Sequence, residues 1–67
     1  MKNGVIQTEA QAYSVPNFCH AHGISKGLFY LLQQRGSGPQ IMKIGRRTLV
    51  SKEAAAKWRE RMEAKSA

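Results

Sequence analysis

Two adjacent arginines, Arg46 and Arg47, are the residues of this 67-residue chain whose chemistry is easiest to interpret. They follow Gly45 and lie between two short apolar segments, 41–44 and 48–50, a pattern that predicts a β-hairpin with the arginines at its tip. The planar guanidinium group binds phosphate oxygens in a bidentate manner and also fits the narrow minor groove of DNA. We therefore expect one arginine in the minor groove and the other on phosphate, in either order.

The turn of this hairpin can be drawn in two registers. A two-residue turn at Gly45 and Arg46 groups four side chains on one face, namely Met42, Ile44, Arg47 and Leu49. A three-residue turn over residues 45–47 groups a different four, namely Met42, Ile44, Thr48 and Val50. We favour the three-residue turn because it keeps both arginines out of the core. Lys43 and Thr48 flank the tip and are expected to add phosphate contacts.

A second set of candidate contacts lies in segment 25–35, whose pattern is helical. Lys26, Tyr30 and Gln33 share one face of this helix because of their spacing. Gln33 is a candidate for reading adenine through its amide, and Lys26 for a guanine or phosphate contact. Tyr30 is assigned a phosphate hydrogen bond, the alternative being a half-buried core tyrosine.

The two ends of the same segment offer weaker candidates. Ser25 and Lys26 lie at the positive N-terminal end of the helix, where a phosphate can be held. Gly27 would let the backbone approach DNA closely, although a glycine is also tolerated near a helix start. Gln34 and Arg35 are assigned contacts with the DNA backbone or with solvent.

Cys19, His20 and His22 suggest two other chemistries. Cys19 and His22 share a helix face, but a closed zinc site needs four ligands and the sequence offers no second cluster. A nucleophilic Cys19 would need an ordered base and a third orienting group, and the chain contains no aspartate. We expect a buried Cys19 with both histidines at the surface, no metal, no cofactor and no enzymatic activity.

The composition favours a nucleic acid as the partner. The net charge is +7, from 11 lysines and arginines against 4 acids, and no acid occurs between Ala10 and Lys52. A patch of one sign on a small domain is typical of nucleic-acid-binding proteins. No apolar run approaches the ~20 residues that span a bilayer, and no signal peptide or lipidation motif is visible, so no membrane contact is expected. A single cysteine suits a reducing cytoplasm.

Helix signals predict two helices between Ser14 and Gly36. Ser14 is a candidate N-cap and Gly23 a candidate stop, which predicts a helix over 15–22 with Pro16 in its first turn. Ser25 and Gly36 bracket a second helix, from Lys26 to about Arg35. The expected core stripe of this second helix is Phe29 and Leu32, with Leu28 beside them. The tight connection between the two helices, a glycine and the apolar Ile24, predicts a helix-turn-helix.

A third helix is predicted after the hairpin. Ser51 is its candidate cap, and Glu53 suits its first turn. Its expected buried stripe consists of Ala54, Ala55, Trp58 and Met62. The predicted fold class is α+β, a winged helix-turn-helix over residues 13–67, preceded by a flexible arm over residues 1–12 in which Val5 and Ile6 are the one candidate pairing segment.

Over about residues 13–62, and most clearly over the run 23–58, the chain resembles the small winged-helix proteins grouped as AlpA-like or excisionase-family regulators, distant relatives of the MerR DNA-binding head. The matching features, in order, are Ser14, Gly23-Ile24-Ser25, Phe29-Tyr30, Gly36, Gly38-Pro39, Lys43-Ile44-Gly45-Arg46-Arg47, Ser51 and Trp58. The resemblance implies a non-enzymatic protein of a phage, prophage or integrated element in the bacterial cytoplasm, associated with the nucleoid. Such a protein either controls transcription of an integrase gene or bends attachment-site DNA for excision.

The chain departs from this family at two positions of the second helix. Position 28 is usually small and polar and position 31 polar or basic, whereas both are leucine here. A Leu28/Leu31 surface suggests an alternative function, an adaptor that binds an integrase or RNA polymerase with DNA contact secondary. The sequence contains no heptads, so we expect a monomer in solution that binds DNA cooperatively at neighbouring sites.

Overall fold

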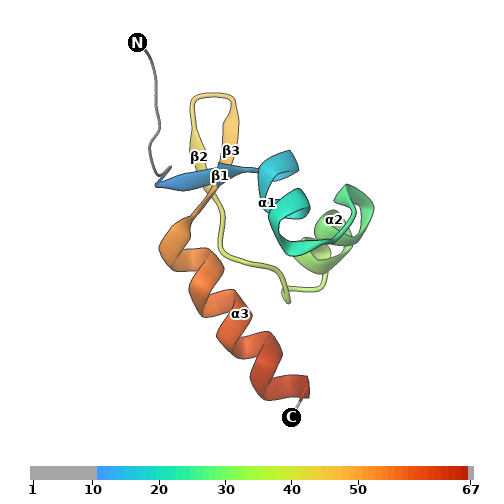
Figure 1. Ribbon diagram of the computed structural model, residues 1–67. Coiled ribbons are helices and arrows are strands. Elements are labelled where there is room, and N and C mark those ends of the chain that lie inside the picture. The colour runs from blue at the N-terminus through green and yellow to red at the C-terminus, as the bar shows by residue number, and fades with distance from the viewer. Residues whose placement is uncertain (1–10, 67) are drawn as a thin grey trace.

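Over residues 11–66, the computed structural model shows an α+β fold with a three-stranded antiparallel sheet and three helices (Figure 1). The elements, in chain order, are β1 (Ala12–Ser14), α1 (Val15–His22), α2 (Lys26–Gln34), β2 (Met42–Ile44), β3 (Arg47–Ser51) and α3 (Lys52–Ser66). The strand order is β1-β3-β2, so β3 is the central strand. The β2–β3 turn points away from α3, which continues directly from the end of β3 (Figure 1).

The first helix has the predicted bounds because its two end signals act as expected. The backbone N–H of Asn17 donates to Ser14 Oγ at 3.2 Å, which satisfies one free amide of the first turn. Gly23 adopts φ 68°, and the N–H of Ile24 donates back to the Cys19 carbonyl at 3.0 Å. This left-handed cap turns the chain sharply into α2.

The second helix also follows its caps. Ser25 Oγ accepts from the N–H of Leu28 at 3.0 Å at the start of α2. At its end Gly36 has φ 72°, and the N–H of Ser37 donates to the Leu32 carbonyl at 2.9 Å. The prediction of a Ser25-capped helix that ends before Gly36 is confirmed.

Strand β1 was not predicted. It pairs antiparallel with β3, with Tyr13 opposite Val50, and the N–H of Lys52 donates to the Gln11 carbonyl at 3.1 Å. Ala12, assigned to the arm from sequence, therefore belongs to the sheet. A strand of three residues is too short to show a period-two pattern. Residues 1–10, including the candidate pairing segment at Val5, lie outside the described residues.

The predicted three-residue turn of the hairpin is wrong. Ile44 pairs with Arg47 and Lys43 with Thr48, which leaves a two-residue turn at 45–46. The preference for the longer turn assumed that the face carrying Ile44 is buried, whereas this side chain is 58% exposed. The shorter turn places Arg47 on that solvent-facing side, so no charge enters the core.

The core forms where α1, α2 and α3 meet the inner face of β3. Phe18 and Val50 are fully buried, and the Phe18 ring meets Phe29 and Trp58 edge-to-face at centroid distances of 5.6 and 5.3 Å. Ser51 Oγ caps α3 by accepting from Ala54 N–H at 2.9 Å. The predicted buried stripe of this helix is confirmed, with two members buried and two partly buried: Ala55, Trp58, Ala54 and Met62.

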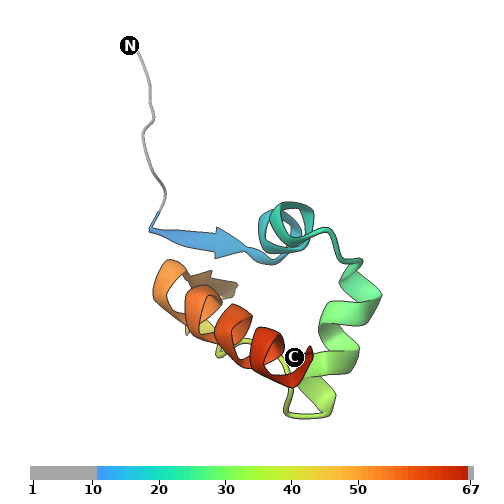
Figure 2. The same ribbon diagram turned by 60° about the horizontal axis from the view of Figure 1, so that its bottom comes forward.

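Two core predictions need correction. Leu28, expected beside the α2 stripe, is 41% exposed because the helix turns it away from Phe29. His22, expected at the surface, is half-buried and stacks on Phe18 with ring centroids 4.1 Å apart. In both views of the ribbon α1 lies between β1 and α2, and in Figure 2 α3 crosses in front of the hairpin strands. This arrangement leaves the far side of α2 and the hairpin turn uncovered by any described element.

Candidate nucleic-acid interface

The outward face of α2 is set by the burial of Phe29. At about 100° per residue, Gly27 and Leu31 lie two positions from Phe29 and therefore close to the opposite side of the helix, and Gln34 lies near them. Leu31 is 39% exposed, whereas Phe29 is 1% exposed. The exposed side chains of α2 and its two caps are Ser25, Lys26, Leu28, Tyr30, Leu31, Gln34 and Arg35.

Gln33 does not belong to this exposed set. It is half-buried, and its Nε2 donates to the Pro39 carbonyl at 2.8 Å. A side chain at Gly38 would collide with the same amide, so the loop after α2 closes directly over Gln33. Of the three residues expected to share a reading face, the structure exposes Lys26 and Tyr30 and engages Gln33 in the loop.

The centre of the exposed face is apolar. Leu28 and Leu31 are one helical turn apart and are 41% and 39% exposed, and Tyr30, next to Leu31 in the sequence, is 53% exposed. The candidate list drawn from the sequence omitted both leucines. The position of Leu31 could have been found by counting around the helix, because a residue two positions from the buried Phe29 lies on nearly the opposite face, whereas Leu28, one position away, lies at about 100°.

The hairpin presents its two arginines differently. Arg46 lies in the turn itself, and Arg47 is the first residue of β3, opposite Ile44. Both side chains are exposed, and within the described part of the chain neither guanidinium group has a hydrogen-bonding partner. On the other face of the hairpin, Lys43 Nζ donates to Thr48 Oγ1 at 3.0 Å, a cross-strand pair beside the turn.

Charge is distributed unevenly over the described elements. The segment 26–51 contains five cationic residues and no carboxylate; the cations are Lys26, Arg35, Lys43, Arg46 and Arg47, all exposed. The carboxylates of the described residues are all on α3, at Glu53, Glu60 and Glu63. The potential over α2 and the hairpin is therefore positive, and the opposing charges are on a different element.

Two α3 arginines hold neighbouring structure in place. The Arg61 guanidinium donates to the Gly38 carbonyl at 3.2 Å, and Arg59 Nη1 lies 2.9 Å from His22 Nε2. His22 Nδ1 lies 2.8 Å from the Phe18 carbonyl, which can only accept, so Nδ1 carries the proton and Nε2 accepts from Arg59. The exposed Arg61 of α3 therefore supports the loop after α2.

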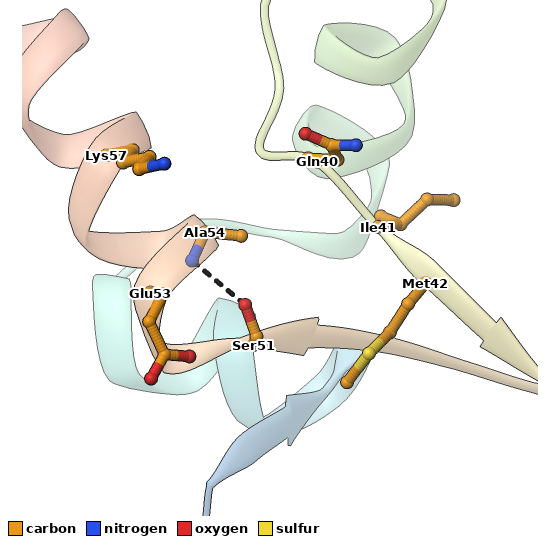
Figure 3. A pocket seen from close by; sticks show the side chains of 7 residues that line it. All are labelled: Gln40, Ile41, Met42, Ser51, Glu53, Ala54 and Lys57. Atoms are coloured by element: carbon orange, nitrogen blue, oxygen red, sulfur yellow. Dashed lines mark hydrogen bonds between the residues drawn. The ribbon is translucent and has the colours of Figure 1, made fainter.

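A hollow lies between β2 and α3. Its lining residues are Gln40, Ile41, Met42, Ser51, Glu53, Ala54 and Lys57 (Figure 3). Ser51 Oγ is occupied by the α3 cap, and Ile41 points away from the other side chains in Figure 3. Within residues 11–66 no three His, Cys, Asp or Glu side chains gather as a possible metal site, and the buried Cys19 thiol lies 3.8 Å from the Ser25 carbonyl.

The chain has no match among family models, curated proteins or solved structures. No helix in the described part of the chain combines the length and the apolar character needed to cross a membrane.

Proposed function

We propose that the chain is a winged helix-turn-helix protein that binds double-stranded DNA sequence-specifically. α2 is the recognition helix in the major groove, and the β2–β3 hairpin is a wing on the minor groove and phosphates. The observation that carries the proposal is the segment 26–51, in which all five charged residues are cationic and exposed. A positively charged surface without carboxylates attracts a polyphosphate such as DNA.

The turn between α1 and α2 supports this assignment. Only Gly23 to Ser25 separate the two helices, and the left-handed glycine sets their relative direction. Phe29 packs on Phe18, which anchors α2 by one face and leaves the other free for the groove. This is the arrangement by which a helix-turn-helix presents its second helix.

Each exposed residue of α2 then has a role. Ser25 and Lys26 hold a phosphate at the positive helix terminus, and Gly27 permits a close approach of the backbone. Tyr30 donates its hydroxyl to phosphate. Gln34 reads a base through its amide in place of Gln33, and Arg35 at the C-cap contacts the DNA backbone.

The hairpin supplies the remaining contacts. Arg46 in the turn enters the minor groove, and Arg47 on the outer face of β3 pairs with phosphate. Lys43, held toward Thr48, contacts a flanking phosphate. The resemblance noted from the sequence suggests an excisionase or transcriptional regulator of a mobile element, acting without enzymatic activity in the bacterial cytoplasm as a monomer that assembles cooperatively on DNA.

Duplex binding as a function of salt tests the proposal. Fluorescence anisotropy with a labelled 20-base-pair duplex should give an affinity that falls linearly in log K against log[salt], with a slope of about −0.9 for each phosphate contact. Three or more contacts are expected from the five cations of segment 26–51. A slope near zero would reject DNA as the partner. A footprint at an attachment site rather than at a promoter would identify an excisionase.

A second candidate function is an adaptor for an integrase or RNA polymerase. The exposure of Leu28 and Leu31, 41% and 39%, is the observation that favours it. In that case substitution of both leucines by serine would abolish capture of the protein partner and leave duplex affinity and its salt slope unchanged.

A further inference from the structure

The apolar centre of the recognition face has a specific chemical meaning if α2 lies in a groove of DNA. Leu28 and Leu31 are exposed on α2, and Gly27 next to them offers no side chain. The amide best placed by sequence to read a base, that of Gln33, is bonded to Pro39 instead. The outermost part of the helix thus carries Gly27, Leu31 and a single amide, that of Gln34, with Leu28 to one side.

We propose that Leu28 and Leu31 read thymine through the C5 methyl group that this base exposes in the major groove. The inference rests on the proposed function and specifies how the same surface selects its sequence. Thymine is the base that presents a methyl group in the major groove, and an apolar side chain buries that methyl from water as it buries any other. A polar side chain at either position would lose this discrimination.

The spacing of the two leucines fits two neighbouring base pairs. Residues three apart on a helix rise about 4.5 Å along its axis and lie on nearly the same face. Successive bases along one strand are separated by about 3.4 Å. We therefore expect Leu28 and Leu31 to contact methyl groups on adjacent or nearly adjacent base pairs, which makes the preferred core of the site a short A·T run.

The charges around the leucines favour DNA over a protein as the occupant of this face. Lys26 and Arg35 stand at the two ends of α2, and the hairpin adds further cations, with no carboxylate in the segment 26–51. These cations suit the two phosphate backbones that border the major groove, and the leucines between them suit the thymine methyl groups exposed in that groove. The apolar part of this face is also small, because it consists of two leucines and Tyr30.

Replacement of thymine by deoxyuridine tests the inference. A preferred site is first selected from a randomised duplex pool with the wild-type protein. The selected duplex is then synthesised with each thymine in turn replaced by deoxyuridine, which removes the methyl group and keeps base pairing and every groove donor and acceptor. The affinity is expected to fall about fourfold at each contacted position, as for loss of one buried methyl-sized group, at one or two positions in total.

Variants assign the effect to the side chains. Leu31→Ala and Leu28→Ala should each bring the thymine-to-uracil affinity ratio to about one at its own position, while Leu31→Met should retain the ratio. Ile41→Ala is the matched control, because Ile41 is 38% exposed against 39% for Leu31 and lies outside the binding surface; its ratio should be that of the wild type. Circular dichroism melting verifies that each variant is folded.

The possible outcomes distinguish failure of the thymine inference from failure of the proposed DNA binding. Equal wild-type affinity for thymine and uracil duplexes would overturn the inference and leave DNA binding intact. A ratio that persists in both alanine variants would also overturn it, because the discrimination would then come from DNA shape. Absence of salt-dependent duplex binding by the wild type would instead overturn the proposed function and the inference with it.

Discussion

Trp58 joins three parts of the molecule through one side chain. Its ring meets Phe18 at 5.3 Å, and its Nε1 donates to the Ser37 carbonyl at 2.9 Å, so α3 is fastened to both α1 and the loop after α2. We expect Trp58→Ala to cost about 3–5 kcal/mol of unfolding free energy. Because a chain of this length is stable by only about 3–10 kcal/mol, the variant should be largely unfolded and bind no DNA.

Urea denaturation followed by circular dichroism measures this loss. Trp58→Phe serves as the matched control, because it keeps an aromatic ring in the core and removes the N–H to Ser37; it should cost about 1 kcal/mol for the hydrogen bond, with a further packing cost for the smaller ring. Near-native stability of Trp58→Ala would mean that α3 does not pack on the first two helices.

Two neighbouring groups determine which ring nitrogen of His22 carries the proton. The ring lies between the Phe18 carbonyl at Nδ1 and the Arg59 guanidinium at Nε2, which requires a neutral ring protonated on Nδ1. We expect long-range ¹H–¹⁵N correlation spectra at neutral pH to show this tautomer for His22. The exposed His20 provides the internal reference. A ring protonated on Nε2 would contradict the contact with Arg59.

At the scale of the element, the hairpin is expected to contribute affinity without contributing stability. Arg46→Ala with Arg47→Ala should weaken duplex binding and reduce the salt slope by about one unit for each lost phosphate contact. Both side chains are exposed, so the melting temperature should barely change. The control is Lys57→Ala with Lys65→Ala, which removes the same charge from α3. Equal effects of the two pairs would indicate a response to net charge alone.

Two adjacent glutamines of α2 provide a second comparison within one element. Gln34→Ala should reduce discrimination at one base pair by about 1–3 kcal/mol and leave stability unchanged, because Gln34 is exposed. Gln33→Ala should instead lower the unfolding free energy by about 1 kcal/mol, because it removes the bond to Pro39. Binding-site selection and thermal melting of both variants check these outcomes; loss of discrimination in Gln33→Ala alone would return the reading role to Gln33.

The helices of this fold could be predicted from the sequence because their signals are local. Ser14, Ser25 and Ser51 cap helices within three residues of themselves, and Gly23 ends one through its own backbone angle. The sheet could not be predicted equally well. Strand β1 depends on its pairing with β3, about 37 residues later in the chain, which no short pattern encodes.

The same difference between local signals and long-range contacts applies to the candidate site. The exposed cations were predictable because charge is read directly from the residue type. The hairpin register was not, since it depends on which face of β2 is covered, and Ile44, which the favoured register placed on the same face as Val50, is 58% exposed. The hydrogen bond from Gln33 could not be predicted for a similar reason, because its acceptor, the Pro39 carbonyl, belongs to a loop that folds back over the helix.

At the scale of the whole molecule, the loop from Gly36 to Gln40 joins the three helices to the hairpin. Its carbonyl groups receive hydrogen bonds from Trp58 at Ser37, from Arg61 at Gly38 and from Gln33 at Pro39. Pro39 itself is fully buried. The connection between α2 and β2 is therefore fastened from both neighbouring helices rather than left as a free linker.

This fastened loop has a consequence for the geometry of a target site. On the proposed mode of binding, the hydrogen bonds to this loop favour one relative position of α2 and the hairpin, so we expect the bases read by α2 and the groove reached by Arg46 to keep a constant helical phase. Insertion of one base pair between the two regions rotates one against the other by about 34–36° and should cost the hairpin its contacts, while insertion of a full turn moves them beyond its reach. On this mode of binding, we expect the protein to be sensitive to the spacing of a site as well as to its bases.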